Sequence, residues 1–181
     1  MKFTEKVRST AESYVQQLQA AEKAIADHHK NGIAEYSYER YKEIAADLEE
    51  KRRLIYSAGL AEIQKIIDDF KAELSRRYVA KGDEIDTGDM ALLNSGYQLK
   101  AADLAAMFDR HIDNHTMLRA ITEYCENKNI EIGREYFGEN AKAAAADSLR
   151  QYAASAFQRP DYGMETEAYF AQIFPRELVG D

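Results

Sequence analysis

The fold of this chain follows from residues 3–29, which read FTEKVRSTAESYVQQLQAAEKAIADHH. Apolar and aromatic side chains, with one histidine at the end, recur in this stretch at alternating spacings of four and three residues. They are Val7, Ala11, Tyr14, Leu18, Ala21, Ile25 and His28. Heptad spacing places these side chains on one face of a helix, where they can pack along a second helix. The stretch therefore predicts a long helix with a helical partner.

A second long helix is expected after a short turn. Lys30, Asn31 and Gly32 predict the end of the first helix, because glycine readily adopts the left-handed conformation of a C-terminal cap. Ser37 is a favourable N-cap for the next helix, and Glu39 suits the positive end of its dipole. We expect this helix to run to about residue 78 and to pack antiparallel to the first one, as a hairpin.

The apolar face of the second helix changes phase near Gly59. The earlier members of this face are Tyr41, Ile44, Leu48, Ile55 and Ala58, and the later members are Leu60, Ile63, Ile67, Phe70 and Leu74. Glycine inside a helix costs about 1 kcal/mol relative to alanine, so its presence at the phase change needs a reason. The pattern predicts a kink or a change of packing partner at this point.

The composition predicts an all-α fold. The two prolines, Pro160 and Pro175, lie near the end, so helices can run without interruption before them. Strong helix formers such as Ala, Glu, Lys, Gln and Leu dominate, whereas Val is scarce. The expected architecture is a long antiparallel helical hairpin, similar to a coiled coil, followed by a compact bundle of short helices.

Residues 81–89 predict a linker between two domains. They read KGDEIDTGD, and two glycines with four acidic residues do not favour a helix. We expect a helical hairpin over residues 1–81 and an acidic domain of short helices over residues 82–181. Gly96 should end one short helix, and Asn114 should cap the start of another. The short helices are expected at about residues 89–95, 101–111, 115–126, 140–157 and 164–174.

The negative charge is confined to the second half of the chain. Residues 1–81 carry 15 Lys/Arg and 14 Asp/Glu, a net charge of +1, whereas residues 82–181 carry 9 Lys/Arg and 18 Asp/Glu, a net charge of −9. Binding to a phosphate backbone is driven by Lys and Arg, so direct nucleic-acid binding is not expected, even though residues 101–126 could imitate a helix-turn-helix. An acidic surface suits a basic protein surface instead.

The sequence predicts a cytoplasmic protein without a membrane segment. The first residues are charged and contain no apolar core of a secretory signal. No stretch approaches the roughly 18 consecutive apolar residues of a membrane-spanning helix. The single cysteine, Cys125, excludes an intramolecular disulfide and is expected to be a buried structural thiol.

Two groups of residues invite a metal-binding hypothesis, and neither meets its pattern. His111 and His115 are four residues apart, but the sequence between them looks like a helix boundary. Asp83, Asp86 and Asp89 are spaced by three, which does not match the ligand order of an EF-hand. These acids are expected to form a solvated linker. We predict no metal, no cofactor and no catalytic activity, because motifs of phosphate-binding loops, dinucleotide sites and serine hydrolases are also missing from the sequence.

Acidic residues next to aromatic ones are the candidate contacts with a partner protein. Tyrosine is favoured at protein interfaces because it combines a large ring with a polar hydroxyl. Carboxylates on helices can imitate the phosphates that a basic groove normally binds. The predicted partner-binding residues are Asp83, Glu84, Asp86, Asp89, Glu131, Glu135, Tyr136 and Glu139.

One part of the chain resembles a known group of proteins. Residues 89–99 read DMALLNSGYQL, residues 101–104 read AADL, and residues 114–121 read NHTMLRAI. This pattern resembles small helical proteins encoded by bacteriophages, over about a fifth of the chain. It departs from them at Lys100, where a Thr cap is expected. The resemblance implies a phage structural or accessory protein. It is similar in kind to anti-CRISPR inhibitors, which bind Cas effectors without performing chemistry.

Two functions are therefore expected from the sequence. The first is a non-enzymatic inhibitor in the host bacterial cytoplasm. Its acidic C-terminal half would mask a basic nucleic-acid-binding surface of a host defence protein, such as a Cas9-type nuclease. The alternative is a phage virion assembly or scaffolding protein that oligomerises through the N-terminal rod, with a homodimer through residues 3–78 as the simplest form.

Overall fold

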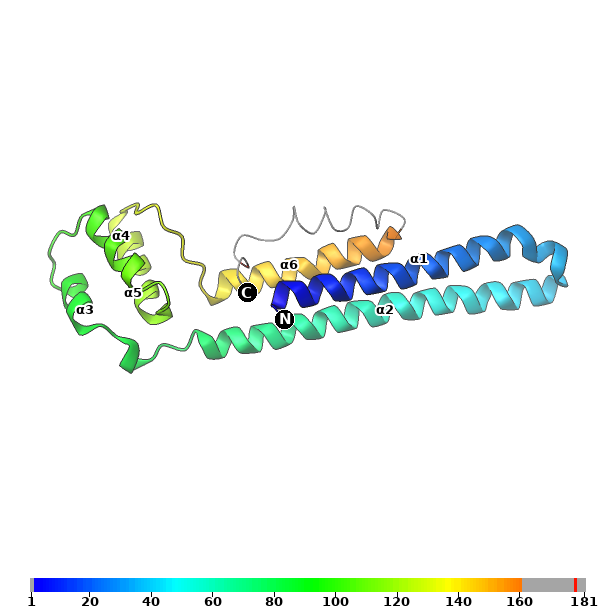
Figure 1. The fold of residues 1–181 in the computed structure, drawn as a ribbon, viewed down its shortest axis with the longest axis horizontal. Helices are drawn as coiled ribbons and strands as arrows, with labels where there is room; N and C mark the ends of the chain where they lie inside the picture. The colour runs from blue at the N-terminus through cyan, green and yellow to red at the C-terminus, as the bar shows by residue number, and fades with distance from the viewer. Residues whose placement is uncertain (1, 161–177, 179–181) are drawn as a thin grey trace. The chain divides into compact units, whose positions relative to one another are not determined.

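The structure is a computed structural model that describes residues 2–160 and residue 178. Over this part of the chain it contains six α-helices, a short 3₁₀ turn at Gly82–Glu84 and no strand, which confirms the all-α prediction (Figure 1). The helices are α1 (Phe3–Glu35), α2 (Tyr38–Arg77), α3 (Thr87–Asn94), α4 (Ala101–Arg110), α5 (His115–Lys128) and α6 (Glu139–Gln158). The helix expected at residues 164–174 lies outside the described residues.

The chain forms two compact units. One comprises Met1–Lys71 and Ala143–Asp181, and the other comprises Ala72–Lys142. We call the described residues of the first unit the stem and residues 72–142 the insert. This grouping differs from the expected division at residue 82, because α6 belongs with the two long helices. The ring of Phe157 on α6 lies 6.0 Å from that of Tyr14 and 6.1 Å from that of Tyr56.

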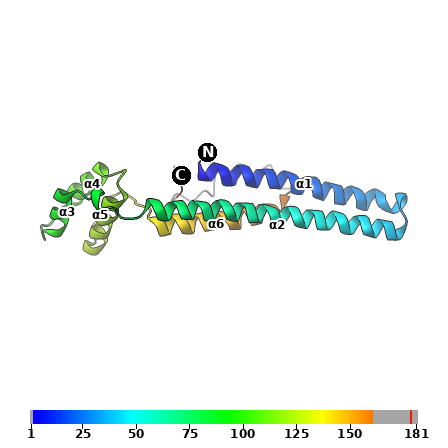
Figure 2. The same ribbon diagram turned by 90° about the horizontal axis from the view of Figure 1, so that it is seen from below.

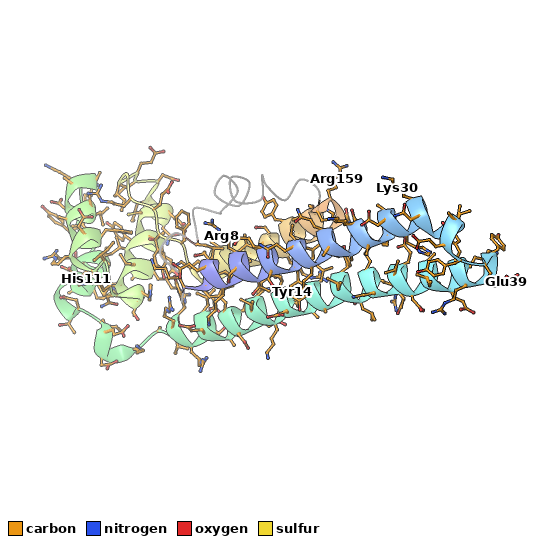
Figure 3. All side chains as sticks on the ribbon, turned by 45° about the vertical axis from the view of Figure 1, so that its right-hand side comes forward. Arg8, Tyr14, Lys30, Glu39, His111 and Arg159 are labelled. Atoms are coloured by element: carbon orange, nitrogen blue, oxygen red, sulfur yellow. The ribbon has the colours of Figure 1, made fainter. Side chains whose placement is uncertain are left out.

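In the stem, α1 and α2 form the expected antiparallel hairpin (Figures 1 and 2). At one end the ring of Phe3 stacks on that of Phe70, with centroids 3.8 Å apart. Further along, the Tyr14 hydroxyl donates to Glu62 at 2.8 Å, and its side chain points from α1 toward α2 in Figure 3. Near the turn the ring of His28 stacks on that of Tyr41 at 4.6 Å.

The first helix does not end at Gly32, so that prediction was wrong. Helix α1 continues to Glu35, and Gly32 is buried without a positive φ. A Cβ atom at Gly32 would lie 2.8 Å from the His28 ring and 3.0 Å from the Tyr41 ring, so close packing explains this glycine. The start of α2 is as predicted, since the Ser37 hydroxyl oxygen accepts from the Arg40 N–H at 3.4 Å.

Gly59 marks a change of packing partner. Helix α2 runs through it without a break. A Cβ atom at Gly59 would lie 2.7 Å from the Phe157 ring and 2.8 Å from the Tyr14 ring. The apolar face of α2 changes phase here because Gly59 lies where α6 joins α1 and α2, with the Phe157 ring of α6 against it. One of the two predicted alternatives is thereby confirmed.

The insert builds its own core from α3, α4 and α5. Its buried members include Leu104, Met107, Phe108, Leu118 and Ile121. Two of its sequence signals behave as predicted. The first is Gly96, which has a φ of 73°. The second is Asn114, whose side-chain oxygen accepts from the Met117 N–H at 3.0 Å.

Candidate protein-binding site

The end of the expected linker is part of a partly buried polar cluster. Asp86 is the N-cap of α3, and its carboxylate accepts from the Asp89 N–H at 2.9 Å. Asp89 is only 7% exposed. Its Oδ2 atom lies 2.8 Å from Nε2 of His111 and 3.3 Å from Nη2 of Arg110, both at the end of α4. The prediction of a solvated linker was therefore wrong at Asp89, because its partners lie about 20 residues further along the chain.

The donor atoms of this cluster are close enough to consider a metal ion. One atom each from Asp86, Asp89 and His111 lie within 4.8 Å of one another. Two features oppose a cation here. The Arg110 guanidinium already neutralises part of the charge, and the N-terminus of α3 presents the positive end of a helix dipole. The cluster is therefore explained as a polar tether between α3 and α4, which satisfies a buried carboxylate.

His115, the second histidine considered for metal binding, has a different environment. The ring of His115 stacks on that of Tyr78 with centroids 4.4 Å apart, and Tyr136 lies 6.3 Å from both rings. The Tyr136 hydroxyl donates to the His115 carbonyl at 3.4 Å. Burial raises the pKa of Tyr136 to about 12, with a further contribution from Tyr78. The structure thus uses His115 and Tyr136 in packing within the insert.

Several of the predicted contact residues are engaged inside the insert. Glu84 accepts from Lys81 at 2.7 Å and from Thr116 at 3.2 Å. The hydrogen bond from Lys81 is the main cause that lowers the pKa of Glu84. Glu139, the first residue of α6, accepts from Ser75 at 2.5 Å. Glu84 and Glu139, like the buried Asp89 and the half-buried Tyr136, therefore make contacts within the insert. They are less available to a partner than the exposed acids.

The remaining predicted residues are exposed. They are Asp83, Asp86, Glu131 and Glu135. Backbone N–H groups of Asp89 and Gly88 lower the pKa of Asp86, which favours the charged form of its carboxylate. Asp83, Asp86 and Glu131 form no ion pair with any described residue. Charges of the insert are therefore presented from the 3₁₀ turn, from the start of α3 and from the segment after α5.

Several cations of the insert form ion pairs with other acids of the insert. Arg134 forms a paired contact with Asp109 at 2.7 and 2.8 Å, which lowers the pKa of that carboxyl. Arg119 pairs with Glu123 at 2.9 Å. The insert carries 13 Asp/Glu and 9 Lys/Arg, whereas residues 2–71 and 143–160 of the stem carry 14 of each. The excess of negative charge in the described chain thus belongs to the insert.

Exposed apolar side chains border the acidic tether, and the sequence reasoning missed them. Ile85 precedes Asp86 and is 41% exposed, while Ile112 follows His111 and is 57% exposed. Asp86 and His111 meet in one cluster, so each isoleucine directly adjoins a member of that cluster along the chain. Each stands alone between polar residues in the sequence, so only the pairing of Asp89 with His111 relates both isoleucines to one cluster.

Comparison with known proteins adds no relative. No known protein family, no curated protein and no solved structure matches this chain. Within residues 2–160, no helix is both long enough and apolar enough to cross a lipid bilayer.

Proposed function

We propose that this protein is a non-enzymatic inhibitor that docks the acidic surface of its insert on a basic, nucleic-acid-binding surface of a host protein. The observation that carries the proposal is the unequal charge of the two units. The stem is neutral over its described residues, whereas the insert has four more acids than bases. Asp83, Asp86 and Glu131 add exposed carboxylates that form no ion pair with any described residue.

The surface combines two properties of a protein interface. Its carboxylates attract a basic partner over several ångströms and increase the rate of encounter. Ile85, next to Asp86 in the chain, and Ile112, next to His111, supply exposed apolar area, which gives contact energy once water has been expelled. A groove that normally binds a phosphate backbone offers the complementary lysines and arginines. A Cas9-type nuclease in the bacterial cytoplasm is a partner of this kind, in keeping with the resemblance to anti-CRISPR inhibitors.

The proposal is tested with a purified Cas9-type nuclease, with and without guide RNA, in a binding assay at increasing salt concentration. Exposed charges are screened by salt, so affinity should fall at least tenfold between about 50 and 300 mM NaCl. Guide RNA should compete, because it occupies the same basic surface. An affinity that does not change with salt contradicts the proposal.

A matched pair of variants separates the insert from total charge. Asp83→Lys with Glu131→Lys reverses two exposed acids of the insert and should weaken binding about tenfold or more. Asp68→Lys with Asp69→Lys reverses two exposed acids of the stem by the same amount and should change affinity less than about threefold. Equal losses in both variants would show that net charge alone, and not this surface, mediates binding.

A second candidate function is phage virion assembly or scaffolding. One observation favours it, namely that the far half of the α1–α2 hairpin leaves its apolar seam incompletely covered among the described residues. A scaffolding protein needs such a self-associating surface. This function does not require the acidic surface of the insert, so the two candidates predict different sensitive residues.

A further inference from the structure

The hairpin of the stem has two halves that bury their seams differently. In the half that contains the chain start, the facing side chains are fully buried. They are Val7, Ala11 and Leu18 of α1 and Ile63 and Ile67 of α2, each with 0% exposure. Helix α6 contributes Leu149, Ala153 and Phe157 to the same core, also with 0% exposure. Three helices therefore enclose this half.

Helix α6 ends partway along the hairpin. Phe157, next to its last residue, packs against Tyr14 and Tyr56. The side-chain amide of Gln19 donates to the Pro160 carbonyl at 2.6 Å, which fixes where the described chain leaves α6. Beyond this level, the described stem consists of α1 and α2 alone, as Figures 1 and 2 show. We call residues 22–58 the distal hairpin. Its edge, at Tyr56, still touches Phe157 of α6, and Lys30 and Glu39 mark its far part in Figure 3.

The distal hairpin lacks a closed core. Between Ala21 and Ile63, no apolar side chain is buried. The residues that continue the heptad seam are only half-buried, namely Ile25, Ile44, Leu48 and Ile55. Leu54 is 53% exposed. A pair of helices covers each seam residue from one side only, so part of its apolar surface stays in contact with water.

Polar contacts hold this pair in register without closing it. Arg52 of α2 donates two hydrogen bonds to Glu22 of α1, at 3.0 and 2.8 Å. Near the turn, His29 and the Tyr41 hydroxyl lie 2.6 Å apart. The seam is thus presented on two helices whose relative positions are already fixed, which lowers the entropy cost of binding a further helical surface.

The charge of the distal hairpin indicates which partner can cover its seam. Residues 22–58 carry 8 Asp/Glu and 7 Lys/Arg with the two signs interspersed, a net charge of −1, so a second copy meets little net repulsion there. A copy that approached the insert would meet an excess of four acids. We propose that a second copy of this chain packs its distal hairpin against the first in a two-fold arrangement, which forms a four-helix bundle over residues 22–58.

This arrangement closes the seam and limits the interface. Two-fold packing brings the half-buried seams of both copies together, as in other helical bundles. The longer of its two helical segments spans about 30 Å, so the interface buries on the order of 600–800 Å² per copy, near the lower bound for a stable dimer. The dissociation constant should therefore lie in the micromolar range. The dimer uses residues 22–58 and not the whole rod of residues 3–78.

The test is sedimentation velocity of the full-length protein between about 1 and 200 µM, a range centred on the expected dissociation constant. The expected result is a monomer at the low end and a dimer at the high end. A monomer at every concentration, or a series of species larger than the dimer, would overturn the proposal. Because the seam is apolar and its charges are balanced, raising NaCl to 500 mM should change the dissociation constant less than about threefold.

Two leucine-to-glutamate variants locate the interface. Leu48→Glu places a charge in the seam and should weaken the dimer at least tenfold. Leu92→Glu makes the same change at a leucine of the insert that is 43% exposed, and it should leave the dimer unchanged. An unchanged dimer in Leu48→Glu, or an equal loss in both, would overturn the proposal. If circular dichroism shows that Leu48→Glu has lost helicity, Leu48→Ala replaces it as the test variant. This variant should weaken the dimer about threefold or more.

This inference stands apart from the docking of the insert. The Asp83→Lys and Glu131→Lys double variant should bind the nuclease weakly and still dimerise, whereas Leu48→Glu should do the reverse. A dimer that depends on the insert acids would remove the assignment to the distal hairpin and leave the docking proposal intact.

Discussion

The stem and the insert reach a folded state in different ways. The stem packs long helices along an apolar seam, with the rings of Tyr14, Tyr56 and Phe157 gathered around Gly59. The insert has short helices whose ends are tied by polar groups, such as Asp89 to His111 and Asn114 to Glu84. A long periodic seam can be detected in the sequence, whereas a tether between distant residues cannot. The two units therefore differ in how far their structures are predictable.

The two units also differ in charge, and this difference assigns them different partners. The neutral stem can approach a copy of itself, and the acidic insert cannot do so without repulsion. An acidic surface is suited to a basic partner, and a half-closed seam is suited to another helical pair. If the units are independent, a change in one of them should alter its own unfolding free energy, its own titration and the reactivity of its own thiol, and should leave the other unit unchanged.

The largest effect is expected where the three helices of the stem meet. Phe157→Ala removes a ring with 0% exposure and leaves a cavity between Tyr14 and Tyr56. It should lower the free energy of unfolding by about 3–5 kcal/mol, measured by urea denaturation with circular dichroism. Gln16→Ala, at an exposed residue of the same stem outside the distal hairpin, is the control and should cost less than about 0.5 kcal/mol. Similar losses in both variants would contradict the three-helix core.

A smaller loss is expected at the point of closest approach. Gly59→Ala adds a methyl group 2.7 Å from the Phe157 ring, so overpacking of about 1–3 kcal/mol should exceed the helix propensity gained. Because the new methyl group would contact the Phe157 ring, Gly59→Ala should cost less in a Phe157→Ala background, where that ring is absent. A double-mutant cycle measured by urea denaturation checks this coupling. Gly59→Ala that stabilises the wild-type protein would show that the close packing is absent.

The stem shows how far a seam can be predicted and where it fails. Heptad positions such as Val7, Leu18 and Ile63 were found correctly because burial follows periodicity. Gly32 was misread as a helix end, because a glycine that permits close packing has the same local signal as one that caps a helix. The packing of α6 in the stem was not predicted, since an alanine-rich helix can pack on many surfaces and its sequence does not indicate which one.

In the insert, the polar tether gives the next prediction. His111→Ala leaves the buried Asp89 carboxylate with Arg110 as its remaining side-chain partner, so the insert should lose about 1–3 kcal/mol of stability. Asp113→Asn, an exposed neighbour, is the control and should cost less than about 0.5 kcal/mol. Replacing both His111 and Asp89 with alanine should cost less than the sum of the single changes. Urea denaturation measures the wild-type protein and each of these variants, with the single Asp89→Ala change included.

A metal ion would give a different result in the same experiment. If Zn²⁺ raised the denaturation midpoint of the wild-type protein but not that of His111→Ala, the cluster would be a metal site and not a tether. With the tether, neither Zn²⁺ nor a chelator should shift the midpoint of the wild-type protein, because Arg110 already neutralises the Asp89 carboxylate.

The candidate site was only partly predictable for a physical reason. Exposure of Asp83 and Glu131 follows from local composition, since short polar segments lie at the surface. Burial of Asp89 depends on His111, which is 22 residues away in the sequence. A carboxylate enters a core only when such a partner is present, so no local pattern could have distinguished Asp89 from its exposed neighbours.

A pH effect confined to the insert should follow from Tyr136. Its pKa in the folded protein is about 12, above the ordinary value of 10.0, so the neutral phenol is the form that folding favours. Its contribution is complete below about pH 10 and is lost as pH rises from there toward 12. The urea midpoint should therefore fall across this range, and Tyr136→Phe should flatten the decline. An equally steep decline in Tyr136→Phe would assign the effect to other groups.

The smallest perturbation is chemical labelling of Cys125, and it tests whether the two units open separately. Burial, with a contribution from the Glu126 carboxylate, raises the pKa of this thiol, so it should react slowly with a thiol reagent near neutral pH. Reaction then requires local opening of the insert, whose free energy sets the rate. His111→Ala, which weakens the insert by about 1–3 kcal/mol, should accelerate labelling about 5- to 150-fold. Phe157→Ala weakens the stem more, yet it should change the rate less than about threefold. If it accelerates labelling as strongly as His111→Ala does, the stem and the insert unfold together, and the contrast between them is one of composition alone.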